Sequence, residues 1–182
     1  MKIAIMQPYF YPYIGYYRLF AEVDLFVIYD CVQYLRRGWI HRNQIKDYSS
    51  KLVWFTLPVL KSSYLAKILE IKLKDNYRDL INLRIKNFPI FSEPSSSFLD
   101  RFLFLETSKP YFLVDYLHSS FTTTLDYLNI KTPIIRSSSL KIPFNLKGEE
   151  RILEILKRLK GTVYLNSPGG RSIYSASNFD KN

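Results

Sequence analysis

The sequence predicts an α/β fold: a mostly parallel sheet with flanking helices in a Rossmann-like three-layer arrangement, with a helical insert in the middle. Its first thirty residues lead to this prediction. A short apolar run at Lys2–Met6 ends at Gln7-Pro8, helical spacing follows at Tyr16–Val23, and a second apolar run occupies Leu25–Tyr29. Strand, helix and strand in this order form a βαβ unit, which implies two parallel strands joined by a right-handed crossover.

The remainder of the chain continues to alternate between the two periodicities. Apolar or alternating runs predict strands at 51–57, 68–73, 132–136 and 162–165. Helical spacing predicts helices at 76–87, 98–107, 111–128 and 149–160, the last stopped by Gly161. We interpret residues 1–182 as a single α/β domain, within which residues 76–128 form a helical subdomain.

Composition limits the class of protein. With 182 residues and 47% hydrophobic residues, the chain has enough apolar side chains for a core, which argues against disorder. The single cysteine excludes an internal disulfide. Neither a signal peptide nor an apolar run of about 18 residues is present, so we expect a cytoplasmic protein with no integral membrane segment.

The net charge of +10 is distributed unevenly. Residues 36–50 alone carry +3, from Arg36, Arg37, Arg42 and Lys46 against Asp47. A basic cluster of this kind suits phosphate, nucleotide or nucleic acid, because arginine binds phosphate through two parallel hydrogen bonds. The alternative is a solvated basic surface without a ligand.

The densest group of polar residues is the segment DCVQYLRRGWIHRN, residues 30–43. It combines an acid that can take a proton, Asp30, with arginines that can neutralise phosphate, as a transferase requires. Gln7 and Asp30 both follow predicted parallel strands, so both are expected at the crevice beyond the carboxyl ends of the sheet. Asp30 as the cap of a turn, Cys31 as a buried apolar residue rather than a nucleophile, and a basic surface hairpin remain alternatives.

Two further segments follow predicted strands. Ser138 lies in a serine triplet after the strand at 132–136, and Asn166 begins the Asn-Ser-Pro-Gly-Gly segment in which Gly169 and Gly170 allow close approach of backbone N–H groups to an anion. A plain turn is the alternative for both segments. No nucleotide-binding or zinc motif occurs, so the sequence names no cofactor and predicts no metal site.

The quoted segment and its neighbours carry a resemblance. The runs KIAIMQPYFYPYIGYYRLF, DLFVIYD and QYLRRGWIHRNQI, followed by SSSL and KGEERILEILKRLKGTVYLNSPGG, resemble the WbqC-like protein family. The matching positions of its signature are Gln7, Tyr13, Gly15, Asp30, Gln33, Arg37, Gly38, Trp39, Arg42 and Asn43. The family is associated with bacterial O-antigen clusters, so the resemblance implies a role in lipopolysaccharide and other surface-polysaccharide biosynthesis.

The resemblance implies a transferase that moves an acyl or aminoacyl group, such as glycyl, to a nucleotide- or lipid-linked sugar. In this hypothesis Arg36, Arg37 and Arg42 hold the diphosphate and Asp30 is the general base. Gln7, Tyr13 and Asn43 then orient the sugar. Similar proteins continue past the Gly-Gly block, so the resemblance also implies a shortened chain that has lost activity if the missing part is needed.

The main alternative is a basic module that binds a nucleotide or nucleic acid without catalysis. The net charge of +10 and the 16% aromatic content suit phosphate contacts and base stacking. Such a module predicts binding that weakens steeply with salt, which distinguishes it from a selective sugar transferase.

Overall fold

The computed structural model describes residues 1–92, 112–143 and 145–167. These residues form two compact units. The sheet unit comprises Met1–Gln7, Tyr13–Cys31 and the described residues from Ile130 onward. The hairpin unit comprises Pro8–Pro12 and the described part of Val32–Asn129. Each unit is described below by itself.

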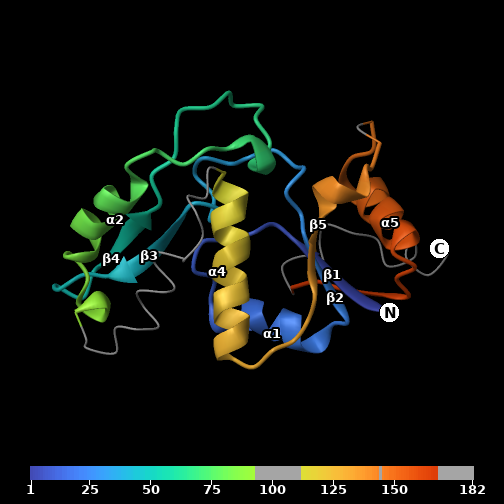
Figure 1. Ribbon diagram of the computed structural model, residues 1–182, viewed down its shortest axis with the longest axis horizontal. Helices are drawn as coiled ribbons and strands as arrows, with labels where there is room; N and C mark the ends of the chain where they lie inside the picture. Colours follow the sequence, from blue (N-terminus) through green and yellow to red (C-terminus); the bar gives the residue numbers. More distant parts are fainter. Residues whose placement is uncertain (93–111, 144, 168–182) are drawn as a thin grey trace. The chain divides into compact units, whose positions relative to one another are not determined.

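The sheet unit is built on four parallel strands (Figure 1). Their bounds are Lys2–Met6 for β1, Leu25–Ile28 for β2, Ile134–Arg136 for β5 and Val163–Leu165 for β6. The spatial order is β5-β2-β1-β6, so the two apolar strands β1 and β2 occupy the centre. This parallel arrangement confirms the predicted α/β class and the predicted pairing of the first two strands.

In the described part of this unit, two α-helices and a short 3₁₀ helix accompany the sheet. They are α1 (Ile14–Glu22), η3 (Ser137–Leu140) and α5 (Gly148–Arg158). Helix α1 buries Tyr16, Tyr17 and Phe20, and the ring of Phe20 stacks on Phe26 of β2 with the ring centroids 3.7 Å apart. Burial of these aromatic rings holds the helix onto the strands, because each removes a large apolar area from water.

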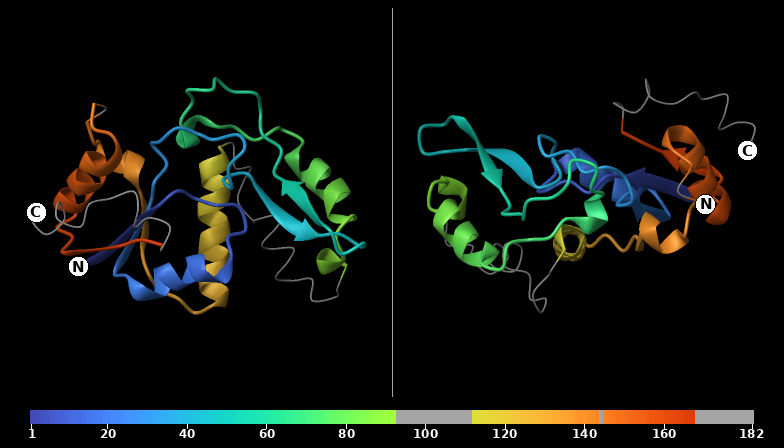
Figure 2. Two further views of the ribbon diagram at one scale, coloured as in Figure 1. Left: turned by 180° about the vertical axis from the view of Figure 1, so that it is seen from behind. Right: turned by 90° about the horizontal axis from the view of Figure 1, so that it is seen from above.

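The hairpin unit is named for its two antiparallel strands (Figures 1 and 2). They are β3 (Arg42–Lys46) and β4 (Leu52–Thr56). The helices among the described residues of this unit are η1 (Ile68–Glu70), α2 (Tyr77–Ile85), η2 (Pro89–Phe91) and α4 (Leu113–Tyr127). The 76–128 subdomain remains a prediction, and its described helices share this unit with the hairpin.

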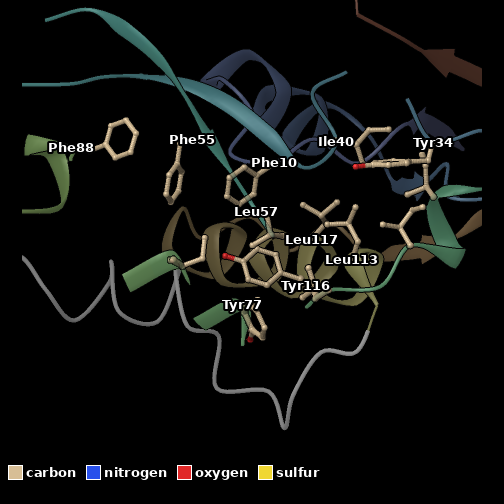
Figure 3. Close-up of a cluster of buried hydrophobic side chains, with 14 residues drawn as sticks. Phe10, Tyr34, Ile40, Phe55, Leu57, Tyr77, Phe88, Leu113, Tyr116 and Leu117 are labelled. Atoms are coloured by element: carbon tan, nitrogen blue, oxygen red, sulfur yellow. The ribbon is translucent and has the colours of Figure 1, made fainter. Parts of the chain in front are cut away.

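A continuous hydrophobic core holds the hairpin unit together (Figure 3). Phe10, from the aromatic loop that follows β1, lies among Phe55 of β4 and Leu117 of α4, and it is fully buried. The ring centroids of Phe10 and Phe55 are 5.6 Å apart. This contact shows why the segment after β1 is rich in aromatic residues: it supplies the core of the second unit.

The described structure differs from the sequence prediction in two elements, and one further predicted element falls outside it. The expected strand at 68–73 instead starts as the 3₁₀ helix η1, and of this run only Lys72 and Leu73 form isolated bridges with described residues. Glu70 accepts a 2.8 Å hydrogen bond from the backbone N–H of Lys67, which closes this turn. Strand β3 was not predicted, because RNQIK lacks apolar alternation. The helix predicted at 98–107 lies outside the described residues.

Candidate functional site

The carboxyl edge of the parallel sheet is the first candidate site. From β1 the chain proceeds through β2 to β5 on one side, whereas β6 lies on the other side of β1. Ligands of open α/β sheets bind beyond the carboxyl ends of the strands where the strand order reverses. Gln7 follows β1, Asp30 follows β2, Ser137 follows β5 and Asn166 follows β6, so the structure brings these predicted positions to one edge.

Asp30 lies at this edge with no exposed surface. Its Oδ1 accepts hydrogen bonds from the Ser137 hydroxyl at 2.8 Å and from the Ser138 backbone N–H at 2.9 Å. Its Oδ2 accepts a bond from the Ser138 hydroxyl at 2.6 Å. Three donors therefore satisfy a carboxylate that burial alone would destabilise.

The start of the 3₁₀ helix η3 explains why Ser137 and Ser138 bond to Asp30. Ser137 and Ser138 begin η3, and the first N–H groups of a helical turn lack partners within the turn. Asp30 supplies the acceptor from another strand, so it caps this turn, as one of the two sequence interpretations held. Its role as general base is a prediction that the geometry leaves open: Ser138 is exposed, and its hydroxyl connects the buried carboxylate to solvent.

A buried arginine, which the sequence analysis did not single out, completes this network. Arg151 of α5 is 7% exposed. Its Nε donates to the sulfur of Cys31 at 3.2 Å, and its Nη1 donates to the carbonyls of Pro143 and Leu146. The hydroxyl of Ser137 lies 3.0 Å from the same sulfur. The burial of Arg151 could have been inferred from the sequence, because Arg151 precedes the buried Ile155 of α5 by four residues and so lies on the same face of the helix.

The predicted residues of the PYIGY segment also belong to the sheet unit. Tyr13 precedes α1 and is 64% exposed, so its ring is available to a ligand. Gly15 lies under that ring: a Cβ on Gly15 would come within 2.4 Å of Cε2 of Tyr13. The backbone carbonyl of Gln7 accepts a 2.7 Å hydrogen bond from the Tyr16 hydroxyl, which ties the end of β1 to α1. Asn166 accepts a hydrogen bond from the N–H of Ser167 at 2.8 Å.

The second candidate site is the basic cluster of the hairpin unit, formed by Arg36, Arg37 and Arg42. Arg36 donates to the carbonyl of Ser62, and Arg42 donates to the carbonyl of Gly38 at 3.2 Å. Among the described residues, none of the three forms an ion pair with an acidic side chain. Their positive charge is therefore not neutralised by the described part of the chain.

Two tryptophans accompany this basic cluster. The guanidinium of Arg42 lies 4.0 Å from the ring centroid of Trp54, a cation–π contact, and the rings of Trp39 and Trp54 are 5.2 Å apart. Trp39 and Trp54 are 44% and 42% exposed. Exposed aromatic surface beside free positive charge suits a ligand with both a flat face and an anionic group. Trp39 was expected at the site from the sequence, whereas Trp54 was not.

Other predicted positions of this unit hold the backbone in place. The Asn43 side-chain amide donates to the carbonyls of Phe10 at 3.1 Å and Tyr11 at 2.6 Å, so it fastens the aromatic loop to β3. Gln33 donates to the carbonyl of Tyr64 at 2.8 Å. These contacts use both N–H donors of the Asn43 amide and one of the two donors of the Gln33 amide. Ligand binding by Asn43 and Gln33 stays a prediction.

Tyr34 and His41 form a buried polar pair next to the arginines. Their exposed fractions are 4% and 8%, and their ring centroids are 5.4 Å apart. Neither the Tyr34 hydroxyl, which lies beside Ile40 in Figure 3, nor Nδ1 of His41 has a hydrogen-bond partner in the described part of the protein. Burial, and then the charge of Arg42, lower the pKa of His41 from 6.5 to about 4, so its imidazole is neutral at pH 7.

The sequence-predicted site residues thus fall into two groups. Gln7, Tyr13, Gly15, Asp30, Ser138 and Asn166 belong to the sheet unit, and Gln33, Arg36, Arg37, Trp39, Arg42 and Asn43 belong to the hairpin unit. Gly169 and Gly170 lie outside the described residues. Over the described ranges, no group of three His, Cys, Asp or Glu side chains is arranged to hold a metal ion. No described helix is long and apolar enough to cross a membrane.

The parallel sheet with polar residues along its carboxyl edge places the chain among α/β proteins. Comparison with known proteins then gives the family: the chain belongs to the WbqC-like protein family, which matches residues 7–182. It is also similar to the uncharacterized protein Rv1507c of Mycobacterium tuberculosis, with 28% identity over 183 residues that cover 99% of this chain and 78% of that protein. No solved structure matches the chain.

Proposed function

We propose that this protein is a transferase of bacterial surface-polysaccharide (O-antigen) biosynthesis that transfers an acyl or aminoacyl group to a nucleotide- or lipid-linked sugar. The observation that carries the proposal is the basic cluster of Arg36, Arg37 and Arg42, which has no acidic partner among the described residues and lies beside two exposed tryptophans. Phosphate groups of a linked sugar supply the missing negative charge, and arginine binds them in a bidentate manner.

The sheet unit supports the chemical part of the proposal by itself. The nucleophile is an amine or hydroxyl of the sugar, and the donor is an activated ester or thioester. The new bond joins the sugar nitrogen or oxygen to the acyl carbon while the bond from that carbon to the leaving group breaks. The proton lost by the nucleophile passes through the Ser138 hydroxyl to Asp30, and it then protonates the leaving group.

A binding measurement tests whether the basic cluster binds phosphate. Arg37 is exposed, and its side chain forms no hydrogen bond or ion pair with the described residues that an Arg37→Gln change would break. We expect this variant to bind UDP at least fivefold more weakly in a calorimetric titration at moderate salt. Lys61→Gln, which removes one exposed charge from the same unit, is the matched control and is expected to bind as the wild type does. Equal weakening in both variants would indicate a general charge effect rather than a phosphate site.

A transfer assay tests whether the protein transfers an acyl or aminoacyl group to the sugar. The protein is incubated with a UDP-linked amino sugar and a panel of acyl and aminoacyl thioesters, and the sugar is analysed by mass spectrometry. The expected product gains the acyl group and loses one proton from its amine. UDP binding without any product, together with RNA binding that disappears at high salt, would instead support the non-catalytic nucleotide- or nucleic-acid-binding module.

A further inference from the structure

The hairpin unit contains a cleft that the sequence analysis did not predict. Its volume is about 640 Å³, within the range of about 300–1,000 Å³ in which small-molecule sites occur. The turn between β3 and β4 contributes to its lining, as do β4 itself and the residues at the end of α2. Its lining residues include Asp47, Tyr48, Trp54, Arg84, Asn87 and Phe88.

The aromatic part of this lining includes two exposed rings. Tyr48 is 64% exposed and Trp54 is 42% exposed, whereas Phe88 is buried in the core and forms the floor on the protein side. The faces of these rings accept flat apolar surfaces, such as the carbon–hydrogen face of a sugar ring or a nucleobase.

The polar part of the lining distinguishes between these two ligands. Oδ1 of Asp47 accepts hydrogen bonds from the N–H and hydroxyl of Ser49 and from the N–H of Lys51, at 2.7–3.0 Å. These bonds, that of the Ser49 hydroxyl first, lower the pKa of the Asp47 carboxyl, so it is ionised at neutral pH. Its second oxygen forms no hydrogen bond with described residues, so this oxygen can accept donors from a ligand in place of water.

Two more polar side chains, those of Asn87 and Arg84, line the cleft together with Asp47. The side-chain amide of Asn87 forms no hydrogen bond with the described residues, so its donor and acceptor both remain for a ligand. Arg84 is held by a hydrogen bond to the carbonyl of Thr56, which orients its guanidinium and leaves further N–H donors. A carboxylate, an amide and a guanidinium therefore surround the aromatic faces.

We propose that this cleft binds the ring of a hexose or amino sugar. Each sugar hydroxyl both donates and accepts, so adjacent hydroxyls can satisfy Asp47, Asn87 and Arg84 together. The carbon–hydrogen face of the ring packs on the exposed aromatic surface of Trp54 or Tyr48. Uracil, the base of the UDP probe used below, offers one N–H donor against several from a sugar, so it satisfies these three side chains less completely.

The cleft is connected to the basic cluster through Trp54. The ring of Trp54 lines the cleft and also contacts the Arg42 guanidinium, which lies 4.0 Å from the ring centroid. Arg42, which the proposed function assigns to phosphate, is therefore in contact with a lining residue of the cleft without lining the cleft itself. The link between the cleft and a phosphate rests on the proposed function. The binding of a free sugar by the cleft is independent of the proposed function.

A pair of asparagine variants on the same segment tests the cleft. Asn87 lines it, whereas Asn82 is an exposed residue of α2 that does not. The probe is free N-acetylglucosamine, followed by saturation-transfer NMR. We expect saturation transfer with the wild type and with Asn82→Ala, and its loss with Asn87→Ala. Equal signals from both variants would overturn the proposal, and so would absence of a signal from the wild type.

A titration with UDP and UDP-N-acetylglucosamine separates the cleft from the basic cluster. Asn87→Ala is expected to weaken UDP-N-acetylglucosamine binding at least fivefold and to leave UDP binding unchanged, whereas Arg37→Gln weakens both. If Asn87→Ala weakens both ligands equally, the cleft holds the nucleotide and the sugar assignment is wrong. If Arg37→Gln changes neither while Asn87→Ala abolishes sugar binding, the cleft stands and the proposed phosphate site fails. Melting curves of each variant confirm that it is folded.

Discussion

The hydroxyl of Ser138 donates a 2.6 Å hydrogen bond to Oδ2 of Asp30, a residue 108 positions earlier in the chain. One partner is fully buried and the other is exposed. The pair joins the carboxyl end of β2 to the turn after β5, so it stabilises the edge of the sheet. It also provides a route by which a proton can move between a buried carboxylate and solvent.

Ser138→Ala tests both consequences of this contact. Removing a hydrogen bond to a charged acceptor is expected to lower the free energy of unfolding by about 1–2 kcal/mol, measured by urea denaturation. If Asp30 acts through Ser138, the transfer rate falls about 100-fold or more as well. Ser139→Ala is the matched control, because its hydroxyl donates only to the carbonyl of Arg136. A Ser138→Ala variant that is destabilised but transfers at the normal rate would leave Asp30 a purely structural cap.

Gly15→Ala tests the predicted role of Tyr13 without changing the tyrosine. The new Cβ would lie 2.4 Å from Cε2 of Tyr13, so the exposed ring must move away. The helix itself gains from alanine, so we expect the melting temperature to stay constant or rise. If the Tyr13 ring contacts the ligand, binding of UDP-N-acetylglucosamine weakens several-fold. Tyr13→Ala serves as the comparison: normal binding by that variant would exclude Tyr13 from the site.

The pH dependence of stability provides a test of His41. Its pKa is about 4 in the folded protein and about 6.5 when unfolded, because burial and Arg42 disfavour the charged imidazole. As the pH falls from 6.5 to 4, the unfolded chain binds a proton that the folded protein does not, so the free energy of unfolding decreases. One proton corresponds to a slope of about 1.4 kcal/mol per pH unit, which solvent screening reduces.

His41→Gln supplies the reference curve for this measurement. The difference between the wild-type and variant free energies of unfolding, measured by urea denaturation from pH 7 to pH 4, is expected to change in that window. The wild type loses stability faster than the variant as the medium becomes more acidic. Parallel curves would show that the imidazole titrates equally in both states, and the burial argument would then fail.

The central strands could be predicted because their local pattern and their environment agree. Strands β1 and β2 are short apolar runs buried in the middle of a parallel sheet, and such strands show continuous hydrophobic residues. Strand β3 shows the opposite case: its sequence RNQIK is polar, and it is a strand because it pairs with β4. Pairing with a partner is a property that a local pattern does not contain.

The sequence predicts which residues lie at the strand ends of the candidate site, but it does not predict which of their side chains contact one another. Asp30 and Ser138 were expected at strand ends, yet their hydrogen bond depends on β2 and β5 being neighbours. Arg151 was overlooked because the charged residues Glu149 and Glu150 precede it, which suggests a solvated face. The cleft lined by Trp54 and Asn87 brings together residues from separate elements, and no motif records that proximity.

The end of α5 leads to a final prediction about stability. The sequence suggested Gly161 as the residue that ends this helix, but the left-handed conformation falls on the residue before it, Lys160, with φ of 53°. The N–H of Gly161 then bonds to the carbonyl of Leu156 at 2.8 Å, which closes the helix end.

A left-handed conformation strains a residue with a Cβ, whereas glycine adopts it freely. Lys160→Gly is therefore expected to raise the free energy of unfolding by about 0.5–1 kcal/mol, measured by urea denaturation. Lys157→Gly, inside the last turn of the same helix, removes the same charge and is expected to lower it by about 0.5–1 kcal/mol. A loss of stability in both variants would show that the helix end does not adopt this left-handed closure in solution.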